Sequence, residues 1–220
     1  MFKSKRRAIA VPQSEHLKLV GTLALLWGNA DFDLPPIERL SMVEGMGFHD
    51  RGYGFLDNSP IGAMQDDEWE LIARRGFYTQ YSDLTADMIT KYHFRRLASS
   101  SDSDLRKSLT AEFSKEIDQQ LAQHRFSDEL FERIDRITNL CDVISFNFCF
   151  EEPASGQISI LPRNNADLAV AVQYHIEDGN INVSPWPFSV ESYDGYIIGY
   201  KLPGYPAQLD PVIMPFHLSK

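Results

Sequence analysis

The chain has 220 residues, of which 43% are hydrophobic and 24% are charged, and its formal net charge is -10. This is the composition of an ordinary globular protein, and the chain is long enough to bury a full core without disulfide or metal staples. The acidic balance, 31 acidic against 21 basic side chains, argues against a broad nucleic-acid-binding groove but leaves room for a local basic pocket.

The cysteines and the hydrophobic segments indicate a cytoplasmic protein. Cys141 and Cys149 fall in one predicted helix, where their spacing is ~12 Å, beyond the reach of a disulfide. A reducing compartment is therefore the simpler interpretation. The basic residues between Lys3 and Arg7 are not followed by the apolar run of a signal peptide. The apolar stretch from Leu17 to Trp27 is too short to cross a bilayer, so we expect no membrane association.

The first two-thirds of the chain is predicted to form five or more helices, each marked by a capping Ser or Asp, an opening proline pair or a closing glycine. These helices are expected from Ser14 to about Trp27, from Pro35 to about Phe48, from Leu84 to about Ala98, from the serine-rich loop at 99–103 to about His124, and from Asp128 to about Cys149. Residues 57–68 are predicted to form a loop, because Asp57-Asn58-Ser59-Pro60 and Gly62 favour turns.

The last third has the alternating pattern of strands. Pro153 to Gly156 breaks the preceding helix, and Asp178-Gly179 is a hairpin turn signal. The predicted strands cover Leu168–Ile176, Ile181–Val183, Tyr196–Tyr200 and Val212–Phe216. The expected fold is therefore α+β: a helical region over residues 1–152, followed by a small antiparallel sheet over 153–220 that packs on it as part of the same domain. Trp186, between two prolines, is expected to anchor the sheet to the helices.

Only one dipeptide, His49-Asp50, strongly suggests chemistry at first sight. It lies at the end of the second predicted helix, where imidazole and carboxylate can both turn inward and chelate one metal ion. Helical periodicity also places His16, His93 and Asp142 on or beside buried stripes of three other helices. A carboxylate beside the core, as at Asp142, is costly unless it is paired or bound to a metal.

Each of these residues also has an ordinary explanation. A single histidine on an apolar helix face is usually a core histidine with satisfied hydrogen bonds, and His-Asp dipeptides are common by chance. Asp142 could simply pair with Arg95 or Arg96. Four potential metal ligands that face inward from four helices are nevertheless harder to explain by chance than any one of them.

The order of these residues resembles the HD superfamily, whose pattern is a His, then His-Asp some thirty residues later, then a distant Asp. More closely, the chain resembles an uncharacterised bacterial family known as domain of unknown function 3891. The matching stretches are Gln13–His16 with Leu26–Gly28, His49–Tyr53 with Asp57, Tyr92–Phe94, Asp142–Cys149 and Pro185–Phe188. Phe48 and Tyr53 stand where that pattern has His and Trp.

The resemblance implies an HD-like helical bundle with a metal site. The implied metal ligands are His16, His49, Asp50 and Asp142, with His93 as a further ligand of a second ion or as a group acting on substrate phosphate. Nitrogen and oxygen ligands without thiolates suit Mn, Fe or Zn, as one or two ions.

The implied reaction is hydrolysis of a phosphate ester in a small anionic or nucleotide-like molecule, with Asp50 or His93 assisting proton transfer to or from metal-activated water. Arg51, Lys91 and Arg95 are candidates for neutralising the substrate, although charged surface positions explain them equally. Asp57 is a candidate for orienting a metal ligand, or a turn-forming aspartate.

Two other functions remain open. An HD-like protein that holds two irons, with His93 as an extra ligand, could oxidise a small substrate with dioxygen. A protein that keeps the pocket without catalysis could act as a ligand sensor.

Overall fold

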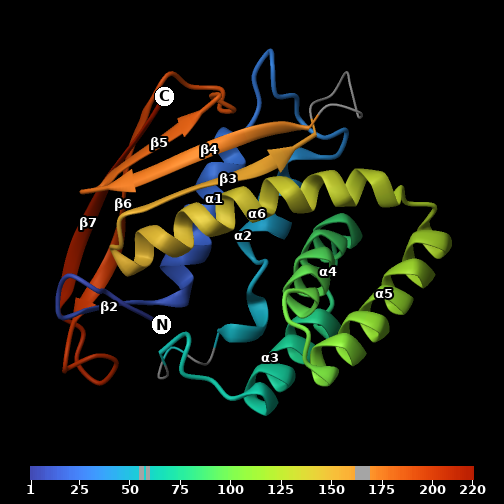
Figure 1. Ribbon diagram of the computed structural model, residues 1–220, viewed down its shortest axis with the longest axis horizontal. Coiled ribbons are helices and arrows are strands. Elements are labelled where there is room, and N and C mark those ends of the chain that lie inside the picture. Colours follow the sequence, from blue (N-terminus) through green and yellow to red (C-terminus); the bar gives the residue numbers. More distant parts are fainter. Residues whose placement is uncertain (55–56, 58–59, 162–168) are drawn as a thin grey trace.

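The computed structural model describes residues 1–54, 57, 60–161 and 169–220, and has helices followed by a sheet (Figure 1). The helices are α1 (Gln13–Leu26), α2 (Arg39–Gly47), the 3-10 turn η1 (Arg51–Tyr53), α3 (Asp66–Tyr78), α4 (Leu84–Ser99), α5 (Asp104–His124) and α6 (Asp128–Phe150). The strands are β1 (Phe2–Lys3), β2 (Ile9–Val11), β3 (Ala154–Ile160), β4 (Val170–Glu177), β5 (Asn180–Ser184), β6 (Tyr193–Lys201) and β7 (Pro211–Ser219). The predicted α+β class is confirmed.

Helix α3 is the one helix of the described chain that the sequence analysis missed. Its first residues fall in the predicted loop at 57–68, of which Asn58 and Ser59 lie outside the described residues. A capping box between Gln65 and Glu68 starts this helix. Helix α2 starts at Arg39 rather than at Pro35, because the chain first makes a short turn in which Ile37 N–H donates to the Pro35 carbonyl at 2.8 Å.

The sheet has the order β1-β2-β6-β7-β5-β4-β3. It is mixed rather than purely antiparallel as predicted, because β7 lies between β6 and β5 and pairs with β5 in parallel. Strand β4 begins at Val170, and Leu168 of the predicted strand lies outside the described residues. The predicted hairpin turn is confirmed: Asp178 and Gly179 have φ values of 49° and 83°, the left-handed conformation of a type I′ turn.

The N-terminus contributes to this sheet, which sequence periodicity did not predict. Strand β2 pairs with β6 through Ile9 and Lys201, and β1 adds the outer edge. Strands of two or three residues are too short to show an alternating pattern. The sheet therefore joins residues from both sides of the expected boundary at 152.

Helices α1 and α6 lie between the sheet and the remaining helices, as Figure 1 shows. Helix α6 contacts β3 on one side and α4 on the other, and many of its residues are buried, Asp142 among them. Helices α3 and α5 lie farthest from the sheet (Figure 1). A polar side chain in the middle of α6, such as Asp142, therefore has to form its contacts inside the protein.

The Pro185–Phe188 segment fixes one end of the sheet to α1, as expected for Trp186. The Trp186 ring packs edge-on against Phe188 with 5.0 Å between centroids, and Phe188 packs in the same way on Trp27. Asn29 Nδ2 donates to the Trp186 carbonyl at 2.7 Å. In the described part of the chain, no helix is long and apolar enough to cross a membrane.

Candidate metal centre

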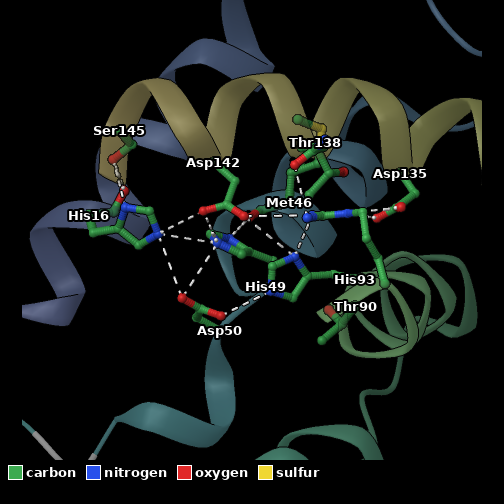
Figure 2. Close-up of polar contacts among 12 residues, drawn as sticks. His16, Met46, His49, Asp50, Thr90, His93, Asp135, Thr138, Asp142 and Ser145 are labelled. Atoms are coloured by element: carbon green, nitrogen blue, oxygen red, sulfur yellow. Dashed lines mark hydrogen bonds and ion pairs between the residues drawn. The ribbon is translucent and has the colours of Figure 1, made fainter. Parts of the chain in front are cut away.

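Four helical elements bring the predicted ligands to one place, where their side chains point toward one another (Figure 2). His16 comes from the first turns of α1, His49 and Asp50 follow the last turn of α2, and Asp142 comes from the middle of α6. His93 on α4 completes the group. The three histidines are at most 1% exposed, and the two aspartates are 9% and 8% exposed.

Close packing of α2 on α4 positions His49 beside His93. At Gly45 an added Cβ would stand 2.8 Å from the Ile89 Cβ and 2.9 Å from the Ala86 carbonyl, so only glycine allows this approach. Thr90 Oγ1 donates to the Gly45 carbonyl at 3.2 Å across the same contact. The His49 and His93 rings end 4.5 Å apart, edge to face.

The nitrogen and oxygen atoms of His16, His49 and Asp142 lie close enough together to hold a metal ion, and so do those of His49, Asp50 and His93. His16 Nε2 lies 3.2 Å from His49 Nε2, 3.5 Å from Asp142 Oδ1 and 3.6 Å from Asp50 Oδ2. His49 Nε2 lies 3.6 Å from Asp142 Oδ1 and 3.7 Å from Asp50 Oδ2. Ligands bound to one ion at about 2.0–2.2 Å lie roughly 3.0–3.5 Å apart when their bonds meet at about 90–110°. His16, His49 and Asp142 could therefore bind one ion, and a shift of the Asp50 side chain would add its carboxylate.

Hydrogen bonds at the far side of each ring determine which nitrogen of His16 and His49 carries the proton. His49 Nδ1 donates to the Met46 carbonyl at 2.7 Å. Ser145 Oγ donates its only proton to the His16 carbonyl at 3.0 Å, so it accepts from His16 Nδ1 at 2.8 Å. In their neutral forms both rings therefore present unprotonated Nε2 atoms to each other, and the carboxylates add only acceptors. Such a group needs a cation at its centre.

The electrostatics of the cluster also favour positive charge. Burial lowers the pKa of His16 to about 4, with the His49 charge as a further cause. Burial acts in the same direction on His49, but Asp50 and Asp142 outweigh it and raise its pKa. Burial alone would raise the pKa of Asp142, yet hydrogen bonding to His49 and the nearby charges hold it well below its usual range. Without a metal, a proton on His49 would supply the missing cation.

The second oxygen of each carboxylate faces another side chain, His93 for Asp50 and Arg96 for Asp142. Asp50 Oδ1 lies 3.0 Å from His93 Nε2, and Asp142 Oδ2 lies 3.6 Å from Arg96 Nη2. Arg96 Nη2 also donates to His93 Nδ1 at 2.8 Å. Because arginine only donates, neutral His93 must carry its proton on Nε2 and donate it to Asp50. In this arrangement His93 orients Asp50 and has no lone pair turned to a metal.

Gln13 and Asp57 support Asp50 from the other side. Gln13 Nε2 donates to Asp50 Oδ2 at 2.6 Å. The Gln13 backbone N–H in turn donates to Asp57 Oδ1 at 2.8 Å. Asp57 thus reaches the cluster through Gln13 rather than by touching a ligand, which is one step farther than the sequence analysis expected.

The three basic residues proposed to contact substrate lie elsewhere. Arg51 Nη2 and Lys91 Nζ both pair with Asp87, at 2.7 Å and 2.9 Å, in a buried group that ties η1 to α4. Arg95 pairs with Glu132. The structure does not bring these residues to the cluster, so their contact with a substrate stays a prediction.

A cavity of about 250 Å³ opens beside the cluster. It exposes Asp50, His93 and Asp142 on one side. Its other lining residues are Tyr53, Ile61, Arg96, Leu97, Asn139, Val143 and Phe146. A small molecule in this cavity would lie directly against the groups that could hold a metal.

Several residues that matter here were not singled out from the sequence. Gln13 and Ser145 each hydrogen-bond to a candidate ligand, and Arg96 was considered only as an ion-pair partner of Asp142. Ser145 lies three residues after Asp142 on the same stripe of α6, so helical spacing could have marked it. Gln13 and Asn139 carried no such signal, because a single amide near a helix start or on a half-buried face is common.

A family model described as a protein of unknown function (DUF3891) matches residues 1–203. Neither the curated proteins nor the solved structures gave a significant match. The predicted resemblance to the family is therefore confirmed, whereas no match extends it to the HD superfamily.

Proposed function

The chain belongs to the DUF3891 family, and from its buried cluster we propose that it is a metal-dependent hydrolase of phosphate esters, with a site of the HD type. One divalent ion is held by His16, His49, Asp50 and Asp142, and the substrate is a small anionic molecule. The proposal rests on the four converging acceptor groups with fixed ring protonation.

The donor set fits a first-row transition metal. Two imidazoles and two carboxylates without thiolate suit Mn, Fe or Zn. The two buried cysteines do not compete: Cys141 and Cys149 are free, and burial raises the pKa of both thiols. A divalent ion there supplies Lewis acidity to a phosphoryl oxygen and to water.

The residues of the chain account for the rest of the reaction. Water adds its oxygen to phosphorus while the bond from phosphorus to the ester oxygen breaks. Asp50 accepts one proton from the water and returns it to the departing alkoxide, which leaves as an alcohol. His93, which donates to Asp50 at 3.0 Å, holds the carboxylate in position for both transfers. Burial of the cluster limits competing hydrogen bonds from bulk solvent.

The alternative of a two-iron oxygenase has weaker support. A second ion would need a lone pair from His93, and both of its ring nitrogens are engaged, one with Arg96 and one with Asp50. This favours one ion per site, and a single ion favours hydrolysis over the di-iron reaction.

Untagged protein loaded separately with Mn, Fe and Zn tests the proposal in an assay of p-nitrophenyl phosphate hydrolysis. We expect metal-dependent release of p-nitrophenol that is lost in His49→Ala and retained in His217→Ala. His217 is a matched control, because it lies on the surface and pairs with Asp194. A metal-loaded protein that binds anions tightly but hydrolyses no ester would instead support a sensor.

A further inference from the structure

Apart from the proposed metal ligands and His93, the polar side chains that line the cavity present mainly hydrogen-bond donors to it. Asn139 Oδ1 accepts from Arg96 Nη1 at 2.9 Å. Since arginine cannot accept, this bond fixes the amide orientation and leaves the Asn139 NH₂ group free to donate. Arg96 Nη1 keeps a second N–H. Within the described residues neither group meets an acceptor for these protons.

Tyr53 supplies a third donor. Its hydroxyl oxygen accepts from Trp69 Nε1 at 2.8 Å, so the lone pair is used while the O–H proton is still available. Trp69 is buried and fixed in place by the stacking of Arg106 over its ring. The Tyr53 hydroxyl is therefore held in place by a buried neighbour.

Charge balance makes the cavity suitable for an anion only when a metal is bound. Three carboxylates, Asp50, Asp135 and Asp142, lie at or beside it, and Arg96 is the cation that pairs with the last two. Arg96 and a divalent ion together neutralise these three negative charges. An additional oxyanion then meets donors rather than a negative field.

The remaining wall is apolar and the space is small. Ile61, Leu97, Val143 and Phe146 line it, and a volume of about 250 Å³ is below the 300–1,000 Å³ typical of sites for drug-sized ligands. This wall suits a compact apolar group, and the volume is small for a nucleotide with its sugar and base.

We propose that the site takes small phosphomonoesters with an apolar ester group, and that Tyr53, Arg96 and Asn139 bind the phosphoryl oxygens. A monoester presents three terminal oxygens for these donors and the ion, whereas a diester presents two. This inference rests on the proposed metal site and names its substrate class.

Calorimetric titration with phenylphosphonate, a non-hydrolysable analogue of such an ester, tests the inference without relying on turnover. The metal-loaded protein should bind one equivalent, and the metal-free protein should bind at least tenfold more weakly. Methyl phenylphosphonate, which mimics a diester, and adenosine monophosphate should also bind at least tenfold more weakly than phenylphosphonate.

Two variants separate the donors from the metal. Tyr53→Phe removes one hydrogen bond and should weaken phenylphosphonate binding about tenfold. Asn139→Asp keeps the acceptor for Arg96 but replaces the donor with a negative oxygen, so it should weaken binding more. Metal content should stay unchanged in both. Tyr81→Phe is the control, because the Tyr81 ring lies beneath Arg51, outside the cavity, and it should bind like the wild type.

Equal phenylphosphonate affinity in wild type, Tyr53→Phe and Asn139→Asp would overturn the inference, as would tighter binding of the diester analogue or the nucleotide. A protein that takes up no metal would instead overturn the proposed function itself. Metal-dependent binding of phenylphosphonate without hydrolysis of phenyl phosphate would uphold the binding site and overturn the hydrolase.

Discussion

His16 and His49 turn their Nε2 atoms toward each other at 3.2 Å, although the hydrogen bonds behind both rings place their protons on Nδ1. Two neutral imidazoles in this position repel each other, and the nearby oxygens of Asp50 and Asp142 add to the repulsion. A cation between the rings converts the same contacts into attraction. The predictions below follow from this relationship and from the residues that maintain it.

Ser145→Ala should weaken metal binding, because Ser145 fixes the Nδ1 proton of His16. Removing the partner of a ligating histidine typically costs 10–100-fold in metal affinity. Competition titration against a chelator measures this. Ser145→Thr keeps the hydroxyl and should restore most of the affinity. Thr138→Val removes another buried hydroxyl of α6, one that donates to the Ile134 carbonyl, and should have no effect on the metal. Equal losses in Ser145→Ala and Thr138→Val would contradict the role of Ser145.

Gln13→Leu should also weaken metal binding, by about tenfold. The side chain is buried and donates to Asp50 Oδ2 at 2.6 Å, so its loss frees the carboxylate to rotate. Gln173→Leu, a change on the exposed side of β4, is the control. The same chelator titration measures the metal affinity of both variants. Wild-type affinity in both would contradict this role of Gln13.

His93→Ala should keep one full equivalent of metal and lower the rate of ester hydrolysis at least tenfold, because His93 orients Asp50 without a lone pair for an ion. Elemental analysis and initial rates on the same sample measure both quantities. Two metals per wild-type chain that fall to one in the variant would show instead that His93 is a ligand. Unchanged metal and unchanged rate would show that it only packs the core.

Asp83 should stabilise α4 in a way that depends on pH. Its Oδ1 accepts from the backbone N–H of Thr85 and Ala86, at 2.8 Å and 3.1 Å, and Ser41 donates to its other oxygen. Although burial opposes them, these hydrogen bonds lower the pKa of Asp83. Asp83→Ala should therefore cost about 1 kcal/mol of unfolding free energy at neutral pH.

The direction of the Asp83 effect follows from its lowered pKa. The stabilisation is fully present above the carboxyl pKa of the unfolded chain, about 3.9, and is lost as the pH falls through the lower pKa of the folded protein. Urea unfolding of wild type and Asp83→Ala at neutral pH and near pH 3 measures the difference. A gap that widens on acidification would contradict the assignment.

The sequence predicted the members of the buried cluster better than their surroundings. His16, His49, Asp50 and Asp142 could be proposed because helical period shows which side chains face inward, and a buried carboxylate needs a reason. Their convergence depends on how α1, α2 and α6 pack, which periodicity does not define. The expectation that these residues converge came instead from the resemblance of their order to the HD pattern.

Helical spacing marks Ser145 as buried, but the roles of the supporting residues depend on tertiary contacts that the sequence does not define. Gln13 lies 37 positions from Asp50 in the chain, and Ser145 lies 129 from His16. Arg51 and Lys91 looked like substrate-binding cations, but both pair with Asp87. The parallel pairing of β5 with β7 was missed for a similar reason, since an alternating pattern indicates a strand and not its neighbour.

The number of metal ions bound per chain decides whether the buried cluster is a metal site. Untagged wild type, Asp142→Asn and Asp135→Asn are dialysed against Mn, Fe or Zn and analysed by mass spectrometry for metal. Asp135 is the matched control, one heptad earlier on α6 and paired with Arg96. We expect one equivalent in the wild type, a large loss in Asp142→Asn and retention in Asp135→Asn. A wild-type protein that takes up none of the three metals would contradict the account, and would leave a proton on His49 as the cation between the two rings.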